Sequence, residues 1–233
     1  MALLKAVAEA GGQHSLTALA RRCELDRATA WRLLITLEAQ GMVQRDPRDG
    51  TFTIGPAVAE LSTVPTRSLA QTAQPLLERV SLETGEIACL GVVDGDELHY
   101  VAEVIPAIAD EQSWLRRPVS LHASSMGKAF LAYLDDARVA ALVGDHPTRF
   151  TDTTITDLVE LRQQLRRIRE QGYAVCRGEL EAGSWGVAAT ILGVHDEPVA
   201  VVCLWGPDGR GDLTRLEALG RLARRTAREL RAA

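Results

Sequence analysis

The residues with the most specific chemistry lie on one face of a short predicted helix, residues 26–37. Four apolar residues recur at helical spacing and define the buried face: Ala30, Leu33, Leu34 and Leu37. The opposite face carries a central arginine with small, β-branched and aromatic neighbours: Ala28, Arg32 and Ile35, flanked by Thr29, Trp31 and Thr36. A guanidinium can bond guanine O6 and N7 together, and methyl groups can contact thymine. The pattern predicts a helix that enters the major groove of DNA.

Neighbouring elements must position that face. Ser15 and Asp26 are N-cap candidates for two helices joined by a tight turn, and Gly41 suits the end of the second helix. Residues 43–46 and 51–54 alternate around a Pro-Arg-Asp-Gly turn, which indicates a hairpin whose arginines could reach phosphates. This order is that of a winged helix-turn-helix; a helical pair in a larger core is the alternative. We expect DNA contacts from Thr17, Arg27, Ala28, Thr29, Trp31, Arg32, Thr36, Arg45 and Arg48.

A second candidate site is the stretch Ser-Ser-Met-Gly-Lys at residues 124–128, which enters a predicted helix. Backbone N–H groups at a helix start, with the positive end of the helix dipole behind them, suit a carboxylate. The alternative is an ordinary N-capped helix with no ligand.

Thiols and imidazoles show no catalytic or metal-binding spacing. The cysteines are scattered without a Cys-x-x-Cys pair, which favours reduced thiols in a cytoplasm: Cys23, Cys89, Cys176 and Cys203. No motif joins a cysteine to a histidine and a third orienting group, so we predict no enzyme activity and no catalytic residue. The five histidines lack ligand spacing, so we predict no metal and no cofactor. A redox-sensing disulfide between Cys176 and Cys203 remains an open alternative.

Composition limits the class of protein. The 233 residues are 46% hydrophobic, enough for a core, and the longest apolar runs are too short to span a bilayer. No secretory leader is visible at the start, so we expect no membrane or export. The net charge is −5, but residues 1–54 carry seven Lys/Arg and six Asp/Glu, a net +1. That field is weak, so specific DNA binding would need at least a dimer.

The remainder of the chain reads as a linker followed by an α+β domain. We expect a short helix from Pro56 that Pro65 breaks, and then an amphipathic helix from Leu69 to Thr84. Strands are expected at 87–93, 97–104, 173–176, 187–192 and 198–205, and helices at 125–134, 137–143, 157–171 and 213–231. An antiparallel sheet flanked by helices follows from this order.

These residues also resemble a known family. Leu16-Thr-Ala-Leu-Ala-Arg-Arg, Arg27-Ala-Thr-Ala-Trp-Arg-Leu-Leu, Leu37-Glu-Ala-Gln-Gly-Met-Val and Thr53-Ile-Gly-Pro are similar to the N-terminal domain of the isocitrate-lyase-regulator (IclR) family of bacterial transcription factors. Further matches are Leu121-His-Ala-Ser-Ser-Met-Gly-Lys-Ala, Gly172-Tyr-Ala-Val, Glu179-Leu-Glu-Ala-Gly and Val199-Ala-Val-Val-Cys-Leu-Trp-Gly-Pro. They occur in order over nearly the whole chain.

The resemblance implies three parts: a winged helix-turn-helix domain at 1–60, a linker at 61–74, and a GAF-like effector-binding and oligomerisation domain at 75–233. It implies a repressor that binds a double-stranded DNA operator as a homodimer or tetramer. A small organic or aromatic acid in the second domain would change its operator affinity. The effector site implied by the motifs comprises Ser125, Met126, Gly127, Cys176, Glu179, Ser184, Gly186, Cys203 and Trp205.

The sequence departs from the family at several of these positions. Cys203 and Trp205 stand where two small hydroxyl residues are common, Gly186 where a cysteine is frequent, and Cys176 where an acidic residue is. Two interpretations remain open: a more apolar or aromatic ligand stacked on Trp205, or a cavity that Trp205 fills. Glu24 stands where the family often has glycine, and a positive φ there would cost on the order of 1 kcal/mol.

Overall fold

The computed structural model describes residues 2–11, 14–107, 109 and 113–232, without the side chains at 59–67, 210 and 232. By their internal contacts the residues form two compact units, Met1–Arg67 and Ser68–Ala233. None of the described helices has the length and hydropathy needed to cross a membrane.

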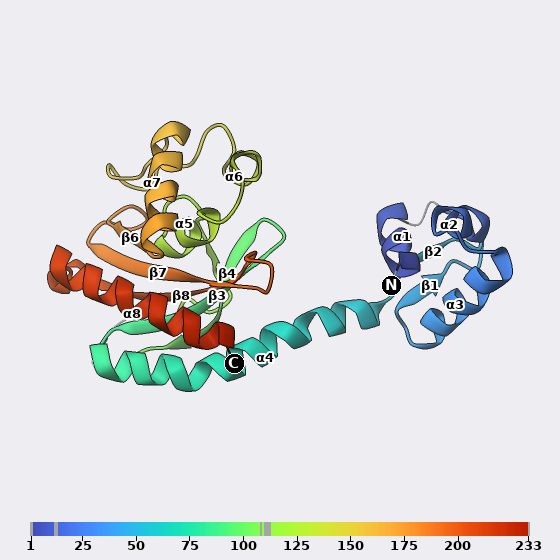
Figure 1. Ribbon diagram of the computed structural model, residues 1–233, viewed down its shortest axis with the longest axis horizontal. Helices are drawn as coiled ribbons and strands as arrows, with labels where there is room; N and C mark the ends of the chain where they lie inside the picture. The colour runs from blue at the N-terminus through green and yellow to red at the C-terminus, as the bar shows by residue number, and fades with distance from the viewer. Residues whose placement is uncertain (1, 12–13, 108, 110–112, 233) are drawn as a thin grey trace. The chain divides into compact units, whose positions relative to one another are not determined.

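The first unit is a helix-turn-helix with a two-stranded wing (Figure 1). Its elements are α1 (Ala2–Ala10), α2 (Leu16–Arg22), α3 (Arg27–Ala39), β1 (Val43–Arg45) and β2 (Phe52–Ile54). Ser15 and Asp26 cap α2 and α3 as predicted, because each side chain accepts the backbone N–H three residues later. The three helices and the wing bury one core around Leu19, Leu34 and Phe52.

Two predictions about this part of the chain are wrong. Leu33 was expected on the buried face of α3, but its side chain is 44% exposed. The buried stripe of α3 is centred on Ala30 and Leu34, and Leu33 lies at its border, beyond the reach of the small core. Pro65 was expected to break a helix, whereas α4 runs without interruption from Pro56 to Thr84. A proline removes one backbone hydrogen bond, and the remaining bonds of a 29-residue helix continue on either side.

The second unit is built on a six-stranded antiparallel sheet with the order β5-β4-β3-β8-β7-β6. The strands are β3 (Ile87–Asp94), β4 (Glu97–Val104), β5 (Pro118–Val119), β6 (Ala174–Arg177), β7 (Ser184–Leu192) and β8 (Pro198–Pro207). The helices are α5 (Ser125–Leu131), α6 (Asp136–Val143), α7 (Leu158–Gln171) and α8 (Leu213–Ala232), with a 3₁₀ turn at Asp208–Arg210. The α+β class predicted from the sequence is confirmed.

Helices cover both faces of this sheet (Figure 1). The second half of α4 and the whole of α8 pack on one face, through residues such as Leu77 and Leu219. On the other face α5 and α7 pack through residues such as Met126 and Leu165. The sequence missed the two-residue strand β5 and placed the start of β7 three residues late, at Val187. Ser184 to Gly186 are strand residues because they pair with Pro207 to Trp205 of β8.

Candidate nucleic-acid interface and effector cavity

Helix α3 presents the predicted arginine face to solvent. Arg32 is exposed at the middle of the helix, opposite the buried Ala30 and Leu34. At its start, Asp26 Oδ1 accepts the Thr29 backbone N–H at 2.9 Å, and hydrogen bonds from Thr29 lower the pKa of Asp26. The first turn is therefore capped, and Arg32, whose Nη2 donates to Thr29 Oγ1 at 3.4 Å, is exposed to solvent.

The wing is held against α3 by a cation–π contact. The Arg45 guanidinium carbon lies 5.1 Å from the centroid of the Trp31 ring. Such a contact contributes about 0.5–1 kcal/mol at an exposed site. Arg48 lies in the wing turn, where its backbone N–H donates to Asp46 Oδ1 at 2.8 Å and leaves the guanidinium to project outward.

A groove of about 650 Å³ runs between the start of α2, α3 and the wing. Its lining includes Thr17, Arg27, Ala28, Trp31 and Arg45, all of which the sequence placed in the DNA-binding set. The other predicted DNA contacts, Thr29, Arg32, Thr36 and Arg48, are not part of this lining.

The turn between α2 and α3 contains a strained residue. Glu24 has φ of +54°, in the left-handed region that favours glycine. The neighbouring Leu25 N–H donates to Ala20 O at 2.9 Å, so the end of α2 holds the turn in this shape. The left-handed conformation that glycine favours is therefore kept at Glu24, so the turn is not adjusted to avoid the cost of a positive φ.

In the second unit a small cavity opens at the start of α5. Its volume is about 60 Å³, and its lining includes eight of the nine residues inferred from the family motifs: Ser125, Met126, Cys176, Glu179, Ser184, Gly186, Cys203 and Trp205. These residues come from α5, from β6 and the turn after it, and from β7 and β8. The ninth, Gly127, is not in the lining. A Cβ at Gly127 would lie 2.3 Å from Leu121 O, so this glycine allows close packing of α5 on the preceding loop.

One of the backbone N–H groups in the predicted anion site at the start of α5 is already hydrogen-bonded within the protein. Ser124 Oγ accepts the Gly127 N–H at 2.9 Å, so one N–H of the first turn is already capped. Ser125 and Met126 are the other residues of that turn, and the helix itself provides no acceptor for their N–H groups. The Ser125 hydroxyl lies 3.6 Å from Cys203 Sγ, and a Cβ at Gly186 would approach that hydroxyl to 2.6 Å. Gly186 thus keeps this wall of the cavity open.

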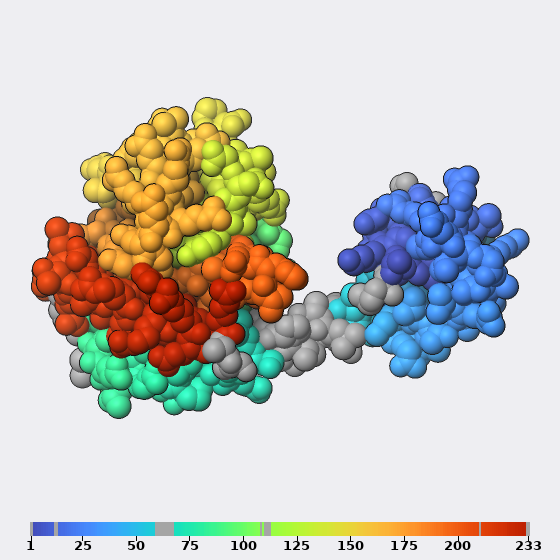
Figure 2. Space-filling model, in the orientation of Figure 1, coloured from blue at the N-terminus to red at the C-terminus, as the bar shows by residue number. Residues whose placement is uncertain are grey.

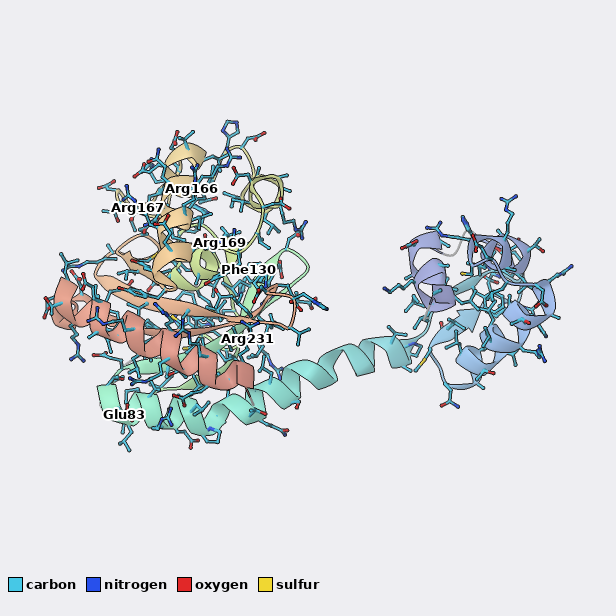
Figure 3. The ribbon with its side chains drawn as sticks, viewed as in Figure 1. Glu83, Phe130, Arg166, Arg167, Arg169 and Arg231 are labelled. Carbon is cyan, nitrogen blue, oxygen red and sulfur yellow. The ribbon has the colours of Figure 1, made fainter. Side chains whose placement is uncertain are left out.

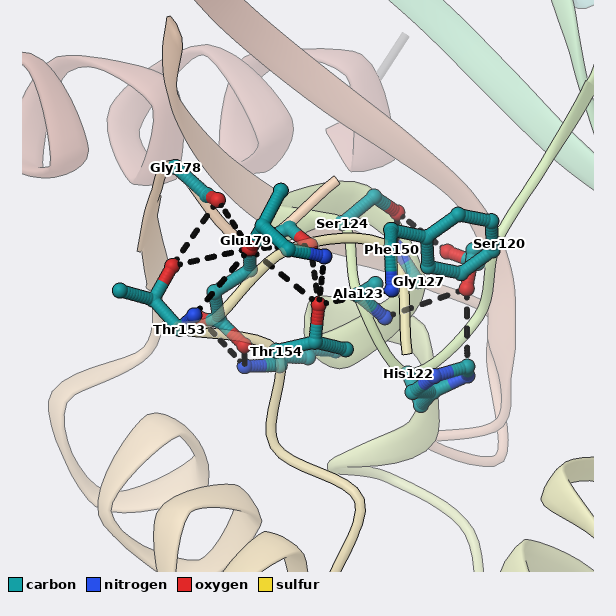
Figure 4. A network of polar contacts seen from close by, with 12 residues as sticks. Ser120, His122, Ala123, Ser124, Gly127, Phe150, Thr153, Thr154, Gly178 and Glu179 are labelled. Atoms are coloured by element: carbon teal, nitrogen blue, oxygen red, sulfur yellow. Dashed lines mark hydrogen bonds and ion pairs between the residues drawn. The ribbon is translucent and has the colours of Figure 1, made fainter. Parts of the chain in front are cut away.

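A buried ion pair fixes another wall. Lys128 Nζ lies 2.6 and 2.5 Å from the two carboxylate oxygens of Glu179, and Lys128 is fully buried. The backbone of Glu179 is also held, because Thr154 Oγ donates to its carbonyl at 2.7 Å (Figure 4). His122 supports the loop before α5 by bonding Thr148 O and the Ser120 hydroxyl. The Glu179 charge is therefore neutralised inside the protein before any ligand arrives.

Comparison with known proteins identifies the two units. Residues 61–232 match the model of the bacterial transcriptional regulator IclR C-terminal domain, and residues 1–47 match the IclR helix-turn-helix domain. The protein belongs to the IclR family. It is therefore a transcriptional regulator and not an enzyme. Its helix-turn-helix domain implies DNA binding.

Individual members of the family are similar in sequence to this chain along nearly its whole length. This IclR-family regulator is 33% identical to the HTH-type transcriptional regulator BhcR of Paracoccus denitrificans, over 93% of this chain and 79% of BhcR. It is 30% identical to the transcriptional repressor IclR of Escherichia coli, over 98% of this chain and 85% of that protein. The inducer-binding domain of Acinetobacter PobR, solved as a double mutant with 3-hydroxybenzoic acid, has a TM-score of 0.64 at 26% identity and covers 70% of this chain and 97% of its own.

The thiols of the regulator do not form the proposed redox pair. Cys176 on β6 and Cys203 on β8 are separated by the intervening strand β7, so about two strand spacings, near 10 Å, lie between their backbones. A disulfide needs Cα atoms less than about 7 Å apart. Burial raises the pKa of Cys203 to about 12, and it also raises the pKa of Cys176 strongly. The Cys176–Cys203 sensor is therefore wrong for this fold.

The cavity wall contributed by β8 contains an unsatisfied donor. Trp205 Nε1 is buried, and no oxygen or nitrogen atom of a described residue accepts a hydrogen bond from it; the Cys89 thiol is its weak neighbour. Burial raises the pKa of the Cys89 thiol well above its usual value, and the nearby Trp205 indole opposes that shift. Among the described residues, no three His, Cys, Asp or Glu side chains gather in a way that could hold a metal ion.

Sequence reasoning missed part of the lining. Tyr100 on β4 and Trp114 in the loop before β5 also line the cavity. No local pattern marks them, because they reach the site only through the order of strands in the sheet. Glu181 also lies in the lining, two residues after Glu179, and was available as an acidic neighbour in the same motif.

Proposed function

We propose that this regulator is a repressor whose operator affinity falls when a small organic or aromatic acid binds the cavity at the start of α5. The observation that carries this proposal is the buried indole N–H of Trp205 in the cavity lining, which has no oxygen or nitrogen acceptor and only the Cys89 thiol as a weak partner. An unsatisfied buried donor costs about 1–3 kcal/mol, and a carboxylate or hydroxyl oxygen of a ligand would recover that cost. The PobR inducer-binding domain, which resembles this unit, was solved with such an acid.

The small volume of the cavity favours a ligand that moves Trp205. The cavity volume of about 60 Å³ is less than the roughly 150 Å³ of a protein cavity that accepts benzene, so full burial of a benzoate ring requires a side-chain shift. In this proposal Trp205 turns aside to stack on the ring, while the first turn of α5 receives the carboxylate. The competing function is a regulator whose cavity Trp205 permanently fills and which senses no ligand.

DNA recognition in this proposal requires more than one chain. One copy of α3 covers only a few base pairs, and the first 54 residues carry a net charge of +1, too little for strong binding alone. A homodimer, or a tetramer of two dimers, would place two recognition helices on a two-fold operator. Ligand would then act by population shift between states with different operator affinity.

The test uses duplex DNA selected from a random pool by the full-length protein. Fluorescence anisotropy of the selected duplex is measured with 3-hydroxybenzoate, a series of other carboxylic acids, and no addition. We expect at least one acid to release the DNA in a saturable way. If every acid leaves the anisotropy titration unchanged and a thermal-shift assay also shows no binding, the proposed sensing function is wrong. The alternative, a cavity that Trp205 fills permanently, would then be supported.

Substitutions at Arg32 test the recognition half separately. Arg32→Ala is expected to weaken binding to the selected duplex by about 1–3 kcal/mol, because a bidentate base contact is lost. Arg32→Lys keeps the positive charge but cannot make the bidentate hydrogen bond of a guanidinium. The specificity for the selected duplex should therefore fall, while the salt dependence of DNA binding is unchanged. Arg48→Ala should instead reduce the salt slope by about one with little change in specificity. Equal affinity of wild type and Arg32→Ala would remove α3 as the recognition helix.

A further inference from the structure

A second concave site lies in the second unit, Ser68–Ala233, away from the cavity at α5. It is a groove of about 220 Å³ where the last turn of α7, the end of β7 and the last turns of α8 meet. The edge strand β6 pairs with β7 from Trp185 to Ala188, so Thr190 and Leu192 lie beyond the end of that ladder. The groove is lined from both α7 and α8, whose surfaces adjoin in Figure 2.

Four arginines line this arginine groove: Arg169 from α7, and Arg224, Arg228 and Arg231 from α8. The three on α8 follow the spacing i, i+4, i+7, which places them on one face of the helix. Figure 3 labels Arg169 at the end of α7 that approaches α8, and Arg231 on α8. Glu170 is the acidic residue of the lining.

The positions of these side chains are set by local contacts. The Arg169 guanidinium lies 5.7 Å from the Tyr133 ring centroid. Arg224 Nη1 donates to Gln171 O at 2.8 Å, and its stem covers Gly172, where a Cβ would lie 2.8 Å from Arg224 Cδ. These contacts hold two guanidinium groups at the groove without neutralising either one.

The positive charge in the groove is only partly compensated. Arg231 pairs with Asp196 at 2.9 Å. Within the described part of the chain, Arg169, Arg224 and Arg228 have no carboxylate partner within 4.0 Å. Like charges brought together on one concave surface repel one another, and a bound dianion relieves that repulsion. The groove therefore has the shape and the charge of an anion site.

We propose that the arginine groove binds the phosphoryl group of a small phosphorylated molecule, such as a phosphate ester or a diphosphate. A guanidinium group can donate two parallel hydrogen bonds to the oxygens of one phosphate. Several guanidinium groups from two helices therefore suit a phosphoryl group, which carries two negative charges. The volume accommodates a small molecule, and the lining is polar and cationic where the α5 cavity is lined by tryptophans and cysteines. The two linings share no residue, so the arginine groove is a site separate from the cavity at the start of α5.

The test is a calorimetric titration of the full-length protein with inorganic pyrophosphate at low ionic strength. We expect saturable binding with one site per chain. Arg228→Gln and Arg169→Gln should each weaken it by about tenfold or more, since each removes a charge-assisted hydrogen bond. Matched controls are Arg225→Gln on α8 and Arg166→Gln on α7, both exposed and both outside the lining. They remove the same charge from the same helices and should leave the affinity nearly unchanged.

Three outcomes overturn the proposal. One is the absence of saturable binding by the wild-type protein. Another is an equal loss of affinity in the control variants and the groove variants, which would indicate a general charge effect. A third is tighter binding of citrate than of pyrophosphate, which would reject the phosphoryl group as the ligand. Circular dichroism of each variant confirms that the fold is retained, as expected for exposed arginines.

Discussion

Lys128 and Glu179 form a bidentate ion pair, at 2.6 and 2.5 Å, in which the lysine is fully buried and the carboxylate nearly so. The pair joins α5 to the turn after β6, two of the segments that line the cavity at the start of α5. Breaking a buried pair leaves one charge uncompensated, which costs about 3–5 kcal/mol.

We therefore expect Lys128→Met to lower the free energy of unfolding of the effector unit by several kcal/mol, measured by urea denaturation, on the order of that cost. Glu179→Gln should have a similar effect. The double variant Lys128→Met/Glu179→Leu should recover much of the loss, since it removes both charges. A double variant as unstable as the sum of the single variants would contradict this account.

Trp205→Ser should enlarge the cavity and change the set of acids that it accepts. The substitution removes the indole that occupies the β8 wall and restores a small hydroxyl residue there. A thermal-shift screen of small carboxylic and aromatic acids should give a different profile for the variant. Val199→Ser, an exposed change on the same strand, is the control. Identical profiles for wild type and Trp205→Ser would mean that Trp205 does not define the ligand site.

Trp31→Ala should loosen the wing and weaken DNA binding. The Arg45 guanidinium is held over the Trp31 ring at 5.1 Å, so loss of the ring frees the arginine and costs about 0.5–1 kcal/mol at this exposed site. The expected result is a several-fold higher Kd for the selected duplex in fluorescence anisotropy. Trp31→Phe retains an aromatic face and should lie between wild type and Trp31→Ala. An unchanged Kd in both variants would remove the wing contact from the binding surface.

Glu24→Gly should stabilise the DNA-binding unit. Glycine adopts the φ of +54° without the steric cost that a side chain meets, which is on the order of 1 kcal/mol. The greater entropy of glycine in the unfolded chain will offset part of that gain. Differential scanning calorimetry should show a higher Tm for the first transition. Glu24→Ala keeps a Cβ at the strained position and should give no comparable increase.

The buried thiols should be slow to react at neutral pH. Burial raises the pKa of Cys89, Cys176 and Cys203, so these groups remain protonated in the folded protein, and only half-exposed Cys23 should react quickly with a disulfide reagent. The unfolded chain releases thiol protons above about pH 8.5, so this contribution to stability is complete below that pH and declines as the pH rises. Detection of a Cys176–Cys203 disulfide by mass spectrometry after peroxide would falsify the assigned strand order.

The sequence alone determined the elements whose signals are local. Side chains of Ser15 and Asp26 cap helices that begin at the next residue, so a few adjacent residues fixed α2 and α3. The helix end expected at Thr84 and the strands expected at 87–93 and 97–104 were also correct, and glycines with positive φ, Gly85 and Gly95, occupy the turns that follow α4 and β3. The exposed face of Arg32 followed from helical periodicity, because the period of a helix is independent of what packs on it.

Only the tertiary structure decided which distant residues meet. Strand order inserts β7 between Cys176 and Cys203 and brings Tyr100 to the cavity, and no spacing in the sequence encodes either result. The exposure of Leu33 depends on how far a small core extends across α3. The arginine groove exists because the sheet places α7 and α8 on either side of its edge, so guanidinium groups from separate helices converge. The periodicity of a sequence indicates which face of a helix or strand is buried. Which other element packs on that face depends on the packing of the whole sheet.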